Sequence, residues 1–439
     1  MSSQNSPTIS EHLPDVIPSD WTAIRLDNLA DFENGLWVGK KTPLKLAKVL
    51  RNTNFNNDGT LDLSDVAHLE VQGNHFEKRQ LRYGDIILER SGGGPTQPVG
   101  RVVYFDLNDE NFSFSNFTTR LRVLDLTTTE PKYLHYYLLH FYLQGHTNAL
   151  QKRTTGIRNL MFAEYKAIAV LIPPLSEQCR IATVLNAIQE AIAAQEDVIA
   201  AARAFKRSLM QRLFTYGPGQ QPAETKETEI GEIPVHWEVA RLAEIAEIQS
   251  GGTPSRRQPV YYENGNISWV KTLDLTNNMV SSTEEQITQV ALSSIRGKLR
   301  PRNTVMIAMY GGAGTIGKSG ILGIEAATNQ AVCCILPNPQ RFDPFYLHYY
   351  VVQLRPRWMQ YAIGTRKDPN ISKTVIENQQ VPLPPLNEQS NISEMLLAVD
   401  EKIAAEEDRK SALQAFFQCM LHQLMTGQTR LLSDEGLPL

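Results

Sequence analysis

The sequence has few cysteines and none of the segments that mark a secreted or membrane-spanning protein. Its four cysteines, Cys179, Cys333, Cys334 and Cys419, show neither metal-ligand nor redox spacing. No apolar run reaches the roughly 18 residues of a membrane span, and the N-terminus lacks a basic region followed by an apolar core. These absences favour a protein of the reducing cytoplasm that holds no structural metal.

The chain also lacks the basic excess that many nucleic-acid-binding proteins carry. It has 43 Lys and Arg residues against 47 Asp and Glu, a formal net charge of −4. These charges are unevenly spread: segments 21–171 and 237–382 are mildly basic, whereas the acidic excess lies on the N-terminal arm, the connecting segment 216–236 and segment 387–427. Charge therefore permits DNA binding without demanding it.

No catalytic constellation is recognisable. Neither a Ser/His/Asp set, a carboxylate pair nor a Cys/His pair repeats or occurs in a motif-like context. His135 and His348 occupy equivalent places among tyrosines, but no carboxylate or second histidine recurs with them, so we expect packed helical histidines rather than bases or metal ligands. We predict no catalytic residue, no metal and no cofactor in this chain.

What the sequence does contain is a long internal repeat. Residues 172–216 and 383–427 align without a gap, and both copies open with the pattern PPL-x-EQ. A double proline cannot lie inside a helix. Beyond it, apolar residues recur at alternating spacings of four and three, which predicts one long helix with a coiled-coil seam in each copy.

A globular segment of mixed structure precedes each long helix. Short β-like runs between Gly/Pro/Asn loops (85–89, 101–105, 304–309 and 331–336) favour an α+β class over a parallel α/β sheet. An aromatic helical patch then follows in each segment, at 131–142 and 343–354. The predicted domains are an N-terminal arm (1–17), a first globular domain (18–175), a central helix (176–216), a linker (217–233), a second globular domain (234–386), a distal helix (387–427) and a tail (428–439).

The linker decides how the two helices pair. A helix of about 40 residues is roughly 60 Å long. If the helices were parallel, the linker of about 17 residues would have to double back over that length almost fully stretched. We therefore predict an antiparallel coiled coil that relates the two globular domains by an approximate two-fold axis.

One loop matches the phosphate-binding pattern G-x-x-x-x-G-K-[ST], at residues 312–319. A strand-like run precedes it, but the segment that follows has two glycines and a β-like end instead of a helix, and no strand supplies a Walker B aspartate. The corresponding loop of the first domain, 91–101, keeps the glycines and has Arg101 where Lys318 stands. We interpret the match as false and expect these two cations to contact the phosphates of a polymer.

In combination these features resemble the specificity subunit of Type I restriction–modification systems, over roughly residues 18–427. The resemblance rests on two divergent modules that are each followed by a PPL-x-EQ helix. It also rests on the W-x-x-x-R-L entry to each module, the stretch GGTPSRRQPVYYENGNISWVKTLDL (251–275), and the segments MYGGAGTIGKSGIL and AATNQAV. The segment LERSGGGPTQPVGRV of the first module is similar to another common variant of such modules.

The resemblance implies a role as well as a fold. Each module would be a target recognition domain that reads one half of an asymmetric bipartite DNA site, and the paired helices would set the spacer and dock the methyltransferase subunits. Two methyltransferase subunits would bind S-adenosylmethionine and methylate adenine N6, and two restriction subunits would use ATP and Mg, so this chain would not itself be an enzyme. Two alternatives stay open: a P-loop NTPase, and a coiled-coil adaptor without a DNA role.

Arg and Lys neutralise phosphates, and Arg, Asn and Gln read base edges. Polar residues in the loops of both modules are therefore the DNA-binding candidates. These are Lys40, Lys41, Arg90, Ser91, Thr96, Gln97, Arg101, Asn116, Arg158, Asn159, Thr253, Ser255, Arg256, Lys271, Tyr310, Thr315, Lys318, Asn329, Gln330 and Arg366. The subunit-interface candidates are Glu177, Gln178, Ile192, Ile199, Glu388, Gln389, Ile403 and Leu413. For Lys318, Arg256 and Arg101 we predict phosphate contacts.

Overall fold

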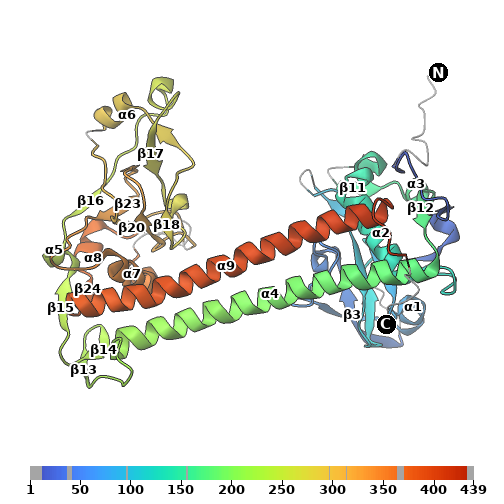
Figure 1. The fold of residues 1–439 in the computed structure, drawn as a ribbon, viewed down its shortest axis with the longest axis horizontal. Coiled ribbons are helices and arrows are strands. Elements are labelled where there is room, and N and C mark those ends of the chain that lie inside the picture. Colours follow the sequence, from blue (N-terminus) through green and yellow to red (C-terminus); the bar gives the residue numbers. More distant parts are fainter. Residues whose placement is uncertain are drawn as a thin grey trace. The chain divides into compact units, whose positions relative to one another are not determined.

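The computed structural model describes residues 12–36, 42–94, 97–154, 157–295, 297–312, 314–362 and 370–432. The chain divides into two compact units: unit 1 is residues 1–195 with 409–439, and unit 2 is residues 196–408. Each unit contains one globular module and one half of each long helix (Figure 1).

Unit 1 is built around an antiparallel sheet with the strand order β2–β9–β5–β7. Smaller sheets, β4–β3–β8, β10–β11–β6 and β1–β12, accompany it. The elements of the module are β1 (Thr22–Arg25), β2 (Ala30–Asn34), β3 (Leu44–Leu50), β4 (Ala67–Gln72), α1 (Gly73–Arg79), β5 (Asp85–Glu89), β6 (Ser91–Gly93), β7 (Val102–Phe105), β8 (Phe112–Phe114), β9 (Thr118–Val123), α2 (Pro131–Leu143), β10 (Gln151–Thr154), β11 (Ile157–Leu160), α3 (Phe162–Lys166) and β12 (Ala169–Ile172).

The central sheet of unit 1 is buried on both faces. Side chains alternate between the two faces of a strand, and Ile86 and Leu88 of β5 accordingly join the core around α2. Ile87, between them, belongs to a second core with Phe112 and Phe114 of β8. A strand covered on both faces has a continuous apolar run, which is why residues 85–89 could be predicted as a strand.

Unit 2 contains a five-stranded sheet with the order β16–β23–β20–β21–β18, in which β18 is parallel to β21. The sheets β19–β17–β22, β15–β24 and β13–β14 complete it. The elements are β13 (Thr225–Thr228), β14 (Gly231–Pro234), β15 (Glu238–Arg241), α5 (Leu242–Ile245), β16 (Ile248–Ser250), β17 (Ile267–Val270), β18 (Met279–Val280), β19 (Gln286–Ile287), α6 (Gln289–Ser294), β20 (Val305–Ala308), β21 (Ser319–Leu322), β22 (Ala327–Thr328), β23 (Val332–Ile335), α7 (Pro344–Trp358), α8 (Lys373–Glu377) and β24 (Gln380–Leu383).

The two modules repeat one framework. The order β2–β9–β5–β7 of unit 1 corresponds to β16–β23–β20–β21 of unit 2. In each, the first strand runs into a glycine that lies against a backbone carbonyl: a Cβ on Gly35 would stand 1.9 Å from the oxygen of Ser115, and one on Gly251 would stand 1.8 Å from that of Thr328. Only glycine fits this approach, which accounts for the glycine that both modules have at this place.

Both long helices start directly after the double proline. α4 spans Leu175–Tyr216 and α9 spans Leu386–Met425 (green and red in Figure 1). The first-turn amides of Glu177 and Glu388 donate to the carbonyls of Pro174 and Pro385. The prediction of two long helices is confirmed. Among the described residues, no helix combines the length and apolar character needed to span a membrane.

The helices run antiparallel within each unit. In unit 2, Arg203 pairs with Glu407 and Lys206 with Asp400, so the residue numbers rise along α4 as they fall along α9. In unit 1, Arg180 near the start of α4 donates to the carbonyl of Leu431, just beyond the end of α9, at 2.6 Å. The predicted antiparallel pairing is therefore confirmed.

The segment predicted as a linker, 217–233, is more ordered than its composition suggests. Strands β13 and β14 form an antiparallel hairpin in which Thr225 faces Pro234 and Thr228 faces Gly231. Lys226 of this hairpin donates to the carbonyl of Trp237 at 2.7 Å. The prediction of a linker therefore missed this hairpin, which the Gly/Pro-rich composition of the segment did not indicate.

Candidate nucleic-acid interface

The two repeated histidines are core residues, as predicted. His135 and His348 are buried on α2 and α7, and burial lowers the pKa of His135 to about 3 and that of His348 to about 4. Both are therefore neutral imidazoles near neutral pH. Among the described residues, no group of three or more His, Cys, Asp or Glu is arranged to hold a metal ion.

Lowering the pH is expected to destabilise both units through these histidines. In the unfolded chain each titrates near 6.5, whereas the folded chain keeps them neutral to much lower pH. Their contribution to stability is complete above pH 6.5 and is lost as the pH falls towards about 3 for His135 and about 4 for His348, by up to about 1.4 kcal/mol per pH unit for each histidine. Chemical denaturation at several pH values checks this: His135→Gln should flatten the dependence, and a slope equal to that of the unsubstituted chain would contradict the assignment.

The loop that matches a phosphate-binding motif is a hairpin connection. It joins β20 to β21, which pair antiparallel, and Gly317 donates its backbone N–H to the carbonyl of Ala308 at 3.0 Å. A phosphate loop needs a helix N-terminus directly after the lysine, but here β21 begins at Ser319. The NTPase alternative is therefore not supported, and the interpretation of the match as false is confirmed.

In unit 2, many predicted contacts gather at one edge of the five-stranded sheet. β16 and β20 end there, and β23 begins. The Thr253 hydroxyl is hydrogen-bonded to the Gln330 amide oxygen. The Met309 N–H donates to the Ala331 carbonyl, and exposed Tyr310 follows directly after Met309. Asn329 lies in the same turn, where its side chain accepts the Ala331 N–H.

The remaining unit 2 candidates differ in exposure. Lys318 is half-buried at the start of β21, and its predicted phosphate contact stays a prediction. Thr315 lies in the turn that precedes Lys318. Its side chain is buried, so it is a structural residue rather than the predicted DNA contact. Ser255 accepts the backbone N–H of Gln258 at its carbonyl oxygen, in a short turn that presents Arg256.

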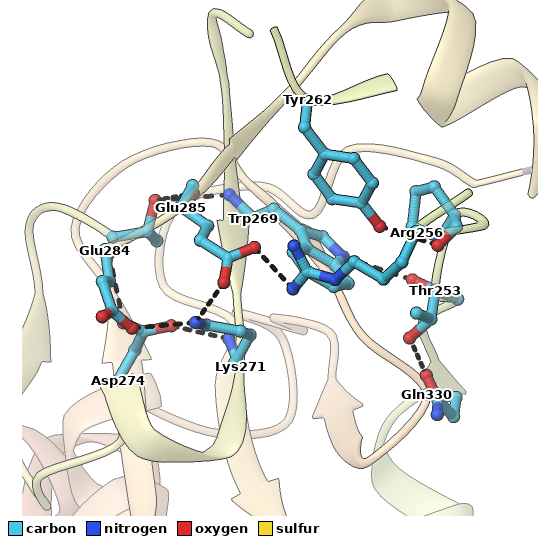
Figure 2. Close-up of polar contacts among 12 residues, drawn as sticks. Thr253, Arg256, Tyr262, Trp269, Lys271, Asp274, Glu284, Glu285 and Gln330 are labelled. Atoms are coloured by element: carbon cyan, nitrogen blue, oxygen red, sulfur yellow. Dashed lines mark hydrogen bonds and ion pairs between the residues drawn. The ribbon is translucent and has the colours of Figure 1, made fainter. Parts of the chain in front are cut away.

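Arg256 and Lys271 are tied to a pair of glutamates (Figure 2). The Arg256 guanidinium lies 4.4 Å from the Tyr262 ring centroid, and its Nη2 is 2.7 Å from Glu285 Oε2. The Lys271 ammonium contacts Glu284 at 2.8 Å and Glu285 at 2.7 Å. These two carboxylates raise the pKa of Lys271, and the Lys271 ammonium, followed by the Arg256 guanidinium, lowers the pKa of Glu285. The Lys271 ammonium is therefore paired with carboxylates of the protein itself, contrary to its prediction as a DNA contact.

In unit 1, the corresponding edge gathers another set of candidates. Arg90 follows β5; its guanidinium lies 4.1 Å from the Phe162 ring centroid and donates to the Asn34 side chain. Ser91 is 2.6 Å from the Asn159 side chain on β11. Gln97 is exposed, and half-buried Asn116 lies in the turn before β9. Arg158 donates to the side chain of Gln151 at 3.4 Å.

Arg101 is a structural residue, and its predicted phosphate contact is wrong. The side chain is buried. Its Nε and Nη2 atoms each lie 2.9 Å from a Glu89 oxygen. Nη1 donates to the Phe55 carbonyl at 2.6 Å, and Nη2 also donates to the Asn52 carbonyl at 2.9 Å. Lys40, Lys41, Thr96 and Arg366 lie outside the described residues.

The EQ pair of the repeated PPL-x-EQ motif is internal, so its assignment to a subunit interface was wrong. In unit 1, Glu177 accepts the indole N–H of Trp21 at 3.2 Å. The buried Gln178 side chain donates to the carbonyls of Thr128 and Pro173 and accepts the Glu130 N–H. The motif thus joins the start of α4 to the loop before α2.

The second copy of the motif makes the same contacts in unit 2. Glu388 accepts the indole N–H of Trp237 at 2.9 Å. Gln389 donates to the Pro384 carbonyl at 2.8 Å and accepts the Asp343 N–H at 2.8 Å. The sequence contained a signal for these internal contacts, because the tryptophan at the start of each module recurs together with the motif.

The apolar interface candidates lie mostly in the helical seam. Ile199 and Ile403 are buried, Leu413 is half-buried, and Ile192 packs against the core of unit 1. Other apolar side chains on these helices are exposed to solvent. Phe205 of α4 and Phe416 of α9, which recur in the repeat, are 58% and 51% exposed.

Sequence reasoning missed the acidic pair Glu284 and Glu285 and the exposed Phe117. Phe117 lies at the unit 1 edge, where its carbonyl accepts the N–H groups of Arg90 and Ser91. Nothing in the local sequence marks these carboxylates as partners of Arg256, because the pairing arises only when β19 pairs with β17 and brings Glu285 beside Trp269.

Comparison with known proteins places this chain among related sequences and folds. A family model described as the Type I restriction modification DNA specificity domain matches residues 18–201 and 234–415. The putative type I restriction enzyme MjaX specificity subunit of Methanocaldococcus jannaschii is 24% identical over 419 residues, which cover 94% of this chain and 95% of that protein. The EcoR124I/EcoR124II specificity subunit of Escherichia coli is 26% identical over 167 residues, 37% of this chain and 40% of that protein.

Two solved structures show the same fold at low sequence identity. A chain from a study of complex assembly and conformational transition of the type I R-M system has a TM-score of 0.60 at 18% identity, covering 95% of this chain and 100% of that one. The type I restriction–modification S subunit of M. genitalium has a TM-score of 0.55 at 16% identity, covering 94% and 98%.

Proposed function

Because this chain belongs to the family of Type I restriction modification DNA specificity domains, and carries two of them, we propose that it is the subunit that reads the DNA target of a Type I complex. Each recognition domain reads one half of an asymmetric bipartite site. Unit 1 reads its half through the edge around Arg90, Ser91 and Asn159, and unit 2 reads the other through the edge around Thr253, Arg256 and Gln330.

One observation carries this proposal: the two modules share a framework but present different side chains at the same edge. Arg79 in unit 1 donates to the Asn34 carbonyl at 2.7 Å, and Arg300 in unit 2 donates to the Ser250 carbonyl at 3.0 Å. Both arginines therefore clamp the end of the first strand of the sheet. A constant scaffold with a variable polar edge suits two modules that recognise different base sequences by the same docking geometry.

The specificity subunit is non-catalytic, and the chemistry of the assembled complex belongs to partner subunits. We propose that two methyltransferase subunits bind S-adenosylmethionine and methylate adenine N6, and that two restriction subunits use ATP with Mg. A coiled-coil adaptor without a DNA role would need no polar edge on either module. The polar side chains at the corresponding edge of both modules argue against that alternative.

The proposal predicts sequence preference in solution. The purified chain with its methyltransferase partner should shift a duplex carrying the bipartite site more strongly than a scrambled duplex at the same salt concentration. Raising the salt should weaken both complexes, because phosphate contacts release counterions, but should preserve the preference. Equal affinity for both duplexes at every salt concentration would contradict the proposal.

The exposed phenylalanines suggest where a partner docks on the helices. Phe205 and Phe416 are equivalent in the repeat, which suits two copies of one partner subunit, and aromatic side chains are enriched in interface hot spots. We expect Phe205→Ser and Phe416→Ser each to weaken binding of the methyltransferase subunit by about tenfold or more. Titration of the labelled partner subunit measures this. Phe117→Ser, an exposed phenylalanine away from the helices, is the control, and an equal loss in all three variants would refute the docking assignment.

A further inference from the structure

Arg256 stands out among the candidate DNA contacts because its position is fixed although its side chain is 57% exposed. Its guanidinium lies over Tyr262 at 4.4 Å and near Trp269 at 5.5 Å, measured to the ring centroids. Its Nη2 is held 2.7 Å from Glu285. Figure 2 shows the guanidinium between the aromatic rings and this carboxylate.

The aromatic side chains of Tyr262 and Trp269, over which Arg256 lies, are hydrogen-bonded to the loop that carries the arginine. The Tyr262 hydroxyl donates to the Pro254 carbonyl at 2.7 Å, and the Trp269 indole donates to the Gly252 carbonyl at 3.2 Å. Thr253, between these two carbonyls, is bonded to Gln330 at the sheet edge. The guanidinium is thus oriented relative to the other candidate contacts of unit 2.

The positive charges of Arg256 and Lys271 are compensated by carboxylates. The two cations face Glu284 and Glu285 at 2.7–2.8 Å, and Asp274 adds a third carboxylate, which accepts the backbone N–H of Lys271 at 2.7 Å. A cluster without excess positive charge gains little from phosphate neutralisation, which depends on uncompensated positive charge. The Arg256 guanidinium nevertheless keeps a fixed orientation. It is a planar, forked group with one nitrogen paired with Glu285 and further N–H donors available to a ligand.

We propose that Arg256 reads a guanine in the half-site of unit 2, and that Glu285 is a positioning residue for it. A planar guanidinium donating to guanine O6 and N7 is the commonest specific protein contact in the DNA major groove. Lys271 supports the arrangement indirectly, because it holds the second oxygen of Glu285 at 2.7 Å. This inference rests on the proposed function, and it replaces the phosphate contact that the sequence alone suggested for Arg256.

The test is single-molecule sequencing of adenine methylation in a host that carries the full chain and its partner subunits. Arg256→Lys keeps the charge but loses the fork, so methylation should spread to sites with another base at one position of one half-site. Discrimination at that position should fall by about tenfold to a hundredfold, with the other half-site unchanged. Arg257→Lys is the matched control, because the described residues form no hydrogen bond or ion pair with its side chain, and it should leave the motif intact.

Two substitutions of Glu285 test its positioning role. Glu285→Ala should relax the same base position as Arg256→Lys, whereas Glu285→Gln keeps an acceptor oxygen and should retain most of the discrimination. Relaxation at a different position, a uniform fall in methylation with the motif unchanged, or an unchanged motif in folded Arg256→Lys protein would each overturn the inference. Absence of any bipartite methylation with the unsubstituted chain would instead overturn the proposed function.

Discussion

Replacing Arg101 by alanine is expected to destabilise unit 1 by about 3–5 kcal/mol, because the substitution leaves Glu89 as a buried charge without its partner. The carboxylate is 1% exposed and faces Arg101 at 2.9 Å. The carbonyls of Phe55 and Asn52 also lose charged donors. For a unit of this size the cost corresponds to a fall in Tm of roughly 6–20 °C, which calorimetry or circular dichroism would measure.

The comparison variant is Arg82→Ala, which removes an exposed arginine of the same unit. It should change the Tm by no more than about 2 °C, since surface substitutions usually stay within about 0.5 kcal/mol. If Arg101→Ala kept its Tm but bound all DNA sequences more weakly with a shallower salt dependence, the residue would be a phosphate contact and its structural assignment would be wrong.

Gly251→Ala is expected to have the largest effect in unit 2. The added Cβ would stand 1.8 Å from the Thr328 carbonyl oxygen, a backbone atom of β22. A side chain could rotate away, but a carbonyl held in a sheet cannot, so the backbone after β16 would have to separate from β22 and the hydrogen bond from the Gly252 N–H to the Thr328 carbonyl would break. We expect a loss of at least about 3 kcal/mol, at or above the upper range for overpacked cores, together with loss of recognition by the edge that starts at Gly252.

Gly314→Ala is the matched control, because a Cβ at Gly314 would meet no atom within 4 Å. Its free energy of unfolding should equal or slightly exceed that of the unsubstituted chain, since alanine restricts the unfolded state more than glycine does. Equal stability of Gly251→Ala and Gly314→Ala in urea denaturation would show that the backbone around Gly251 can accommodate a Cβ, and would contradict the prediction.

The long-range architecture followed from local sequence patterns. The spacing of apolar residues in the repeat identifies α4 and α9, and the double proline marks their starts, since proline ends whatever precedes it. Residues 85–89 and 131–142 were also recognisable, because a strand or helix that is buried on most sides has a dense apolar run.

The site was less predictable, because burial and pairing depend on the folded module. Arg101 and Arg90 both lie in the glycine-rich loop region after β5, yet only Arg101 is buried against Glu89. Glu177 and Gln178 repeat as Glu388 and Gln389, and repetition alone cannot distinguish a shared partner from a shared internal contact. Their tryptophan and carbonyl partners lie more than 40 residues away or in another element, beyond the reach of a local pattern.

The central claim is that this chain selects a bipartite DNA site, one half for each recognition domain. Its most direct test is single-molecule sequencing of adenine methylation in one host carrying the partner subunits, with and without this chain. We predict that an asymmetric motif with a fixed gap becomes methylated only when the chain is present. Methylation that does not depend on the chain, or a single contiguous motif, would contradict the claim.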